Sequence, residues 1–100
     1  MDERAYVVLM RVHLFFPEAG SLKGKRKELL SVKAQLHRRF GASVAEVDHH
    51  DLWQRARLTL SCVGRTYRDV EDLLDSAERY LAGQAFEIGR RDREVVTLDE

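Results

Sequence analysis

The chain has 100 residues, 44% of them hydrophobic, which is enough to bury one core and too few for two. Its 17 basic and 17 acidic side chains cancel, so any attraction to nucleic acid or membrane must be local; no apolar run has the length of a membrane span or the pattern of a signal peptide. The single cysteine, Cys62, excludes an internal disulfide. We expect one cytoplasmic domain, residues 1–100, and the lack of Asn with 13 Arg among the basic residues indicates a thermophilic or GC-rich source.

The first half of the chain predicts a strand, a helix and a second strand. Residues 6–15 alternate between apolar and polar positions, as in a half-buried strand. Pro17 and Gly20 break this pattern, Ser21 can cap a helix over residues 22–40, and Gly41 is a natural stop for it. Residues 43–48 are the next expected strand.

The second half repeats the order strand, helix, strand. Residues 57–64 alternate again, with Cys62 on the side of the core. Thr66 and Asp69 form a capping pair, and apolar residues then recur at helical spacing until Gly83. Residues 86–98 complete the order, and their middle, Arg90 to Arg93, is too charged for either face of a buried strand, so this strand is expected at an edge.

The order βαββαβ predicts an α+β, ferredoxin-like fold: a four-stranded antiparallel sheet with two helices on one face. The expected core is Val8, Met10, Val12, Leu29, Leu36, Leu58, Leu60, Leu73, Leu74 and Leu81. The other face of the sheet is left uncovered, with Arg11, His13, Thr59, Ser61 and Val63 on it. Because RNA recognition domains of this topology carry stacking aromatics at such positions, that mode of RNA binding is disfavoured. An uncovered face also predicts a homodimer, formed through it or through an edge strand.

A basic run at the start of the first helix departs from the usual rules. The positive N-terminal end of a helix prefers acids, yet this helix opens with cations and contains a glycine. Helix amides, clustered cations and a glycine that allows close approach together predict an anion- or RNA-binding site. Its residues are Lys23, Gly24, Lys25, Arg26 and Lys27, with Arg38 and Arg39 at the far end of the helix. The alternative is a solvated helix face neutralised by neighbouring acids.

Between the second and third strands lies a polar segment that ends in the only tryptophan. We interpret Asp48, His49, His50, Asp51, Trp53 and Gln54 as a specificity loop. Imidazole and carboxylate are ordinary metal ligands, but adjacent residues of an extended segment point to opposite sides, and zinc needs three or four protein ligands. The sequence therefore predicts no metal or other cofactor, and turn residues that hydrogen-bond the backbone are the simpler interpretation. No catalytic residue is predicted, since Cys62 lies on a core position and no serine has a nucleophile context.

Two stretches carry a resemblance to a known family. Residues 21–26, SLKGKR, and residues 44–56, VAEVDHHDLWQRA, resemble the signature stretches of the small bacterial YlxP-like proteins, and the similarity covers nearly the whole chain. The resemblance implies a ferredoxin-like fold, no known activity, and genes placed among those for translation initiation and ribosome maturation. His50 stands where a Gln is expected.

Three functions follow as hypotheses. The first is a binding module for structured RNA or ribosomal particles that uses the basic run on phosphates. The second is a metal-dependent hydrolase built on the Asp48 to Asp51 segment, with His13 and Glu46. The third, a purely structural homodimer, is compatible with the first.

Overall fold

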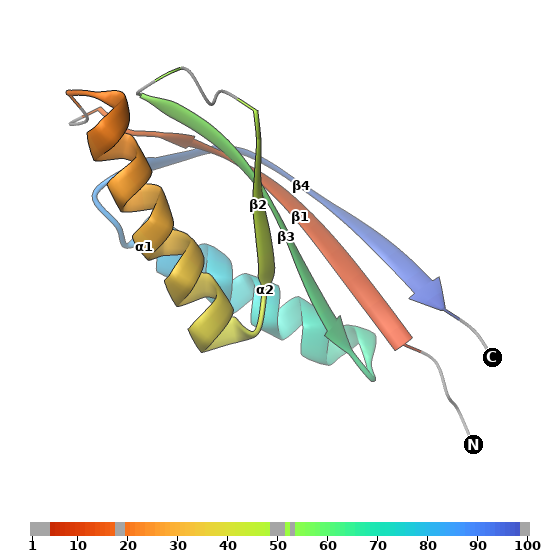
Figure 1. Cartoon of the computed structure of the whole chain (residues 1–100). Helices are drawn as coiled ribbons and strands as arrows, with labels where there is room; N and C mark the ends of the chain where they lie inside the picture. The colour runs from red at the N-terminus through yellow and green to blue at the C-terminus, as the bar shows by residue number, and fades with distance from the viewer. Residues whose placement is uncertain (1–4, 18–19, 49–51, 53, 99–100) are drawn as a thin grey trace.

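A computed structural model describes residues 5–17, 20–48, 52 and 54–98. The chain forms four strands and two helices in the predicted order (Figure 1): β1 (Ala5–Phe15), α1 (Leu22–Phe40), β2 (Ser43–Asp48), β3 (Arg55–Gly64), α2 (Tyr67–Ala82) and β4 (Glu87–Leu98). The strands form one antiparallel sheet in the order β2-β3-β1-β4. The predicted α+β ferredoxin-like fold and the edge position of β4 are confirmed.

Pairing along the sheet separates its two faces. Register partners Val12 and Leu58, and Met10 and Leu60, point to the helices, whereas Arg11 and Thr59 lie between them on the opposite side. Between Val12 and Leu14 the register with β4 shifts, because Gly89 and Arg90 together face His13. This β-bulge lies at the same end of the sheet as the start of α1 (Figure 1).

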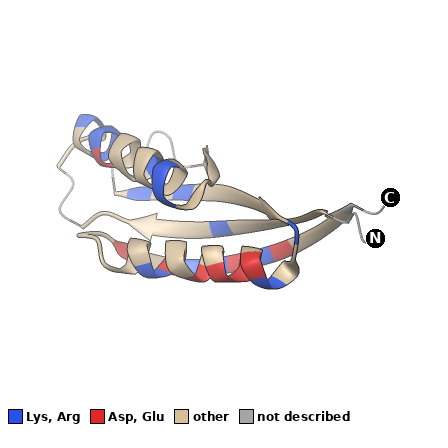
Figure 2. Cartoon of the chain, turned by 90° about the horizontal axis from the view of Figure 1, so that it is seen from below, with Lys and Arg blue, Asp and Glu red and all other residues tan. Residues whose placement is uncertain are grey.

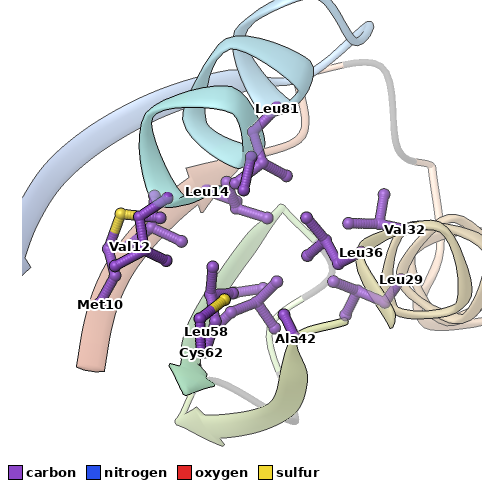
Figure 3. Packing of buried hydrophobic residues seen from close by; sticks show 14 of the residues in the cluster. Met10, Val12, Leu14, Leu29, Val32, Leu36, Ala42, Leu58, Cys62 and Leu81 are labelled. Atoms are coloured by element: carbon purple, nitrogen blue, oxygen red, sulfur yellow. The ribbon is translucent and has the colours of Figure 1, made fainter. Parts of the chain in front are cut away.

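One hydrophobic core lies between the sheet and both helices (Figure 3). Side chains of α1 meet those of β1, β3 and α2 there, which requires both helices on one face. Nine of the ten predicted core residues are buried, and Leu73 packs partly buried against the same cluster. Cys62 is buried as well, and burial raises the pKa of its thiol.

The helix ends follow the capping signals. Ser21 Oγ accepts a hydrogen bond from the Gly24 amide at 3.0 Å, and Thr66 Oγ1 accepts one from the Asp69 amide at 3.1 Å. Gly41, with a φ of 66°, ends α1 in the left-handed conformation that favours glycine. Neither helix within the described ranges has the length and apolar character needed to cross a bilayer.

Candidate nucleic-acid interface

Lys25 lies in the interior and not on the surface. Its side chain is 0% exposed, its Nζ donates a hydrogen bond to the Arg55 carbonyl at 3.0 Å, and the same atom lies 3.4 Å from Glu46 Oε2. The Glu46 side chain is itself only 14% exposed. The expectation that Lys25 contacts a phosphate at the protein surface is therefore corrected: its ammonium group is enclosed by protein and paired with a carboxylate.

This lysine joins three elements at one end of the molecule. It connects the first turn of α1 to Glu46 of β2 and to the first residue of β3. There the Phe16 amide donates a 2.7 Å hydrogen bond to the Gln54 carbonyl, which fixes the end of β1 beside the start of β3. The ladder thus begins at Arg55, two residues before the predicted start, because Arg55 pairs with Phe15.

The other cations of the basic run remain on the surface. Lys23, Arg26 and Lys27 are exposed, as are Gly24 and Arg38. In the described part of the chain, none of these four cations takes part in an ion pair. Arg39 differs, since its guanidinium lies 5.5 Å from the centroid of the Phe40 ring and 4.9 Å from that of Tyr80.

Helical spacing arranges four exposed cations and the half-buried Lys33 as a stripe. At about 100° per residue, positions 23, 26, 27, 33 and 38 fall within an arc of about 140°. The buried face, formed by Lys25, Leu29, Val32 and Leu36, lies on the opposite side of the helix. Leu30, which is exposed, lies inside the arc, and Glu28, the one acid of α1, lies outside it. We call positions 23, 26, 27, 33 and 38 the cationic stripe.

Acidic residues gather on α2. Figure 2 shows Lys and Arg along α1 and mostly Asp and Glu along α2. Arg93 of β4 pairs with Glu71 at 2.8 Å and Asp75 at 2.9 Å, and Arg91 pairs with Glu78 at 3.1 Å. Burial lowers the pKa of Arg93, but the hydrogen bond to Asp75 and the surrounding carboxylates outweigh it and raise the pKa overall. Arg91 and Arg93 of β4 therefore have carboxylate partners on α2, whereas Lys23, Arg26, Lys27 and Arg38 have none among the described residues.

The uncovered face carries the residues expected there. Arg11, His13, Thr59, Ser61 and Val63 lie on it in register, and Arg11 pairs with Asp92 at 3.4 Å. Sequence reasoning missed three neighbours of His13 at the end of this face, namely Phe15, Arg55 and Arg57. The alternation of β1 was sufficient to place Phe15 on the uncovered face, whereas placing Arg55 there required the register between β1 and β3.

The predicted specificity loop falls largely outside the described residues. This holds for His49, His50, Asp51 and Trp53, and for the side chain of Asp48. Gln54 is described, and its carbonyl accepts the hydrogen bond from the Phe16 amide. Among the residues that the structure describes, no three His, Cys, Asp or Glu side chains are grouped to hold a metal ion.

Comparison with known proteins identifies the family. A model described as "Protein of unknown function (DUF503)" matches residues 7–93. The chain belongs to this family. It is 35% identical over 46 residues to "Uncharacterized protein YlxP" of Bacillus subtilis (strain 168); the aligned segment spans 46% of the chain and 50% of that relative. The predicted membership of a YlxP-like family of unknown function is thus confirmed.

A designed protein shares the fold. "De novo designed protein Foldit4" superposes with a TM-score of 0.56 at 14% identity, over 96% of this chain and 98% of the designed one. At this identity the likeness concerns the arrangement of strands and helices alone.

Proposed function

We propose that this DUF503 family member is a cytoplasmic module that binds structured RNA, free or in ribosomal particles, through the cationic stripe of α1. The observation that carries the proposal is the state of Lys23, Arg26 and Lys27. They are exposed, and no carboxylate in the described part of the protein pairs with them. A phosphate backbone supplies the missing negative charge, and cations in excess of local counter-charge are the usual source of affinity for it.

Fold stability gives no reason for these three cations. The first turn of α1 contains no acid, and Lys23 in that turn opposes the helix dipole by about 0.3 to 1 kcal/mol. Arg26 and Lys27 follow in the second turn, where the dipole does not stabilise them. Arg38 and Arg39, by contrast, lie in the last turn, where the dipole favours cations. The predicted cations therefore divide into Lys25, which is structural, two arginines that the helix dipole stabilises, and three exposed cations for which the described residues give no structural reason.

The length of the stripe suits an extended polyanion. Lys23 and Arg38 are separated by about 23 Å along the helix axis, at 1.5 Å per residue. Several phosphates of one RNA strand or helix can lie along this distance. Ribosomal RNA is the first RNA to test, because the resemblance to YlxP-like proteins implies genes placed among those for ribosome maturation.

The test compares two triple variants of equal charge. In the first, the stripe variant, Lys23, Arg26 and Lys27 are changed to Gln. In the control, three exposed arginines are changed to Gln: Arg65 just before α2, Arg68 in its first turn and Arg79 in its last turn. Affinity for a labelled ribosomal RNA hairpin is measured from 50 to 200 mM salt. We expect the stripe variant to reduce the salt slope by about two to three units, at roughly 0.7 to 0.9 for each phosphate that is no longer neutralised, and the control to retain most of the slope.

Two outcomes would count against RNA binding by the stripe. Equal losses of affinity in both variants mean that net charge alone attracts RNA, and an unchanged affinity in the stripe variant means that these cations do not touch it. Urea denaturation of both variants shows whether each remains folded, and the stripe variant is expected to be at least as stable as the wild type.

A further inference from the structure

A depression on the uncovered face lies just beyond the end of α1 that carries these cations. It has a volume of about 270 Å³ and is lined by His13, Leu14, Phe15, Arg55, Ala56 and Gly89. This volume lies just below the range of about 300 to 1,000 Å³ that is typical of small-molecule sites, so the depression suits a ligand no larger than one nucleotide. The cationic stripe on α1 does not include any of these lining residues.

The β-bulge shapes this depression. Gly89 lies opposite His13, where the register between β1 and β4 shifts, and it has no side chain to fill the space. A Cβ at Gly89 would lie 3.6 Å from His13 Cβ, an ordinary contact, and its φ is not positive. Backbone geometry therefore does not require this glycine, and its effect is to leave the face open beside Phe15.

The lining combines an aromatic ring with a cation. Phe15 and Arg55 are register partners on the uncovered face, so their side chains are neighbours, and the Phe15 side chain remains 36% exposed. Arg55 is exposed, and its guanidinium has no ion pair within the described ranges. Aromatic rings stack on unpaired bases of single-stranded RNA, and arginine contacts the adjoining phosphate.

The depression also lies beside the cationic stripe. Lys25 donates its hydrogen bond to the carbonyl of Arg55, so the first turn of α1 directly contacts the residue that lines the depression. Lys23 lies in the same turn, and Arg26 and Lys27 follow directly after Lys25. An RNA strand on these cations can therefore continue over the start of β3 onto the uncovered face.

We propose that this depression binds one unpaired nucleotide of the RNA, with its base stacked on Phe15 and its phosphate on Arg55. The inference rests on the proposed function and adds a preference for a single-stranded segment beside a helix. It differs from the mode disfavoured by the sequence, in which several aromatics in the middle of the sheet each stack a base. Here one aromatic at the end of β1 takes one base.

The experiment uses two RNA probes and the full chain. One probe is a hairpin with a closed tetraloop; the other is the same hairpin with a six-nucleotide 3′ extension that contains 2-aminopurine. We expect the wild type to bind the extended probe roughly 5- to 140-fold more tightly, the range for one stacked base, and to quench its fluorescence. Phe15→Leu should remove the quenching and most of the gain, since only the contact of the phosphate with Arg55 remains, without changing affinity for the plain hairpin.

Matched variants separate stacking from other effects. Tyr67→Leu removes the exposed aromatic on α2 and should keep the gain. Gly89→Ala narrows the depression without backbone strain and should reduce the gain in affinity for the extended probe. If the wild type gains nothing from the extension, or if Phe15→Leu keeps the gain, this inference is wrong, while a salt-dependent hairpin affinity that disappears in the stripe variant still supports the proposed function. If neither probe binds, both proposals fail.

Discussion

Replacing Lys25 by Met separates the structural cation from the surface cations. The change keeps an unbranched side chain that is one atom shorter, and it removes both the charge that lies 3.4 Å from Glu46 Oε2 and the hydrogen bond to the Arg55 carbonyl. Removing one partner of a buried ion pair costs about 3 to 5 kcal/mol, because the other charge is left uncompensated. Glu46 is 14% exposed and keeps some contact with water, so we expect a loss near the lower end, about 3 kcal/mol.

The measurement is urea denaturation followed by circular dichroism. A loss of about 3 kcal/mol corresponds to a melting temperature lower by roughly 12 to 24 °C for a domain of this size, with an unchanged dependence of the unfolding free energy on urea. Lys23→Met is the matched control, since it makes the same chemical change two residues earlier on an exposed position. Its effect should stay within about 0.5 kcal/mol.

A double-mutant cycle tests the pairing itself. Glu46→Gln alone leaves the buried ammonium group without its carboxylate, and the double variant removes both charges, so its loss should be smaller than the sum of the single losses by about 0.5 to 3 kcal/mol. Additive losses, or a Lys25→Met variant as stable as Lys23→Met, would refute the reasoning. In the folded state, Lys25→Met should also leave the salt slope of RNA binding unchanged, because its ammonium does not reach the surface.

Three further predictions concern other parts of the molecule. Arg93→Gln should cost roughly 1 to 2 kcal/mol by leaving the acids of α2 without their shared cation, whereas Arg90→Gln, on an exposed side chain, should cost less than about 1 kcal/mol in the same urea assay. Burial raises the pKa of the Cys62 thiol, so at alkaline pH the folded state keeps a proton that the unfolded chain releases. This contribution to stability is present below about pH 8.5 and is lost as the pH rises. The decline of the unfolding free energy at alkaline pH should therefore be shallower in Cys62→Ala. Sedimentation should show a homodimer at tens of micromolar that Val63→Asp dissociates, since Val63 is 64% exposed on the uncovered face; a monomer of 11.6 kDa would contradict this.

Most of the fold could be predicted because the apolar periodicity of each segment agreed with the capping and helix-ending residues at its ends. Alternation placed both central strands with the correct face inward, and the capping residues and Gly41 placed the helix ends. Charge in the middle of β4 indicated an edge strand without any knowledge of the pairing. The predicted start of β3 was two residues too late. Arg55 and Ala56 are recognised as strand residues only from their pairing with Phe15 and Leu14 of β1.

The site could be predicted only in part, and Lys25 shows why. Its position, four residues before Leu29 and seven before Val32, places it on the buried face of α1, so the spacing contained the information. The charge of the lysine argued for the surface, and a single sequence does not reveal that Glu46 comes from another strand to meet it. Composition identified a basic run, helical spacing could have assigned Lys25 to the buried face, and the tertiary structure was needed to identify its partner Glu46.

That separation strengthens the functional argument for the cations that remain. A cation at the start of a helix can be required by the interior of the protein and not by a ligand, and Lys25, which is buried and paired with Glu46, is such a cation. That requirement does not explain Lys23, Arg26 and Lys27, which make no ion pair in the described part of the protein, and Lys23 also opposes the helix dipole. The ion pairs of β4 with α2 show that this chain supplies counter-charges where the fold alone needs them. The described residues supply none for Lys23, Arg26 and Lys27, and this difference is the basis for the proposal that a negatively charged partner binds them.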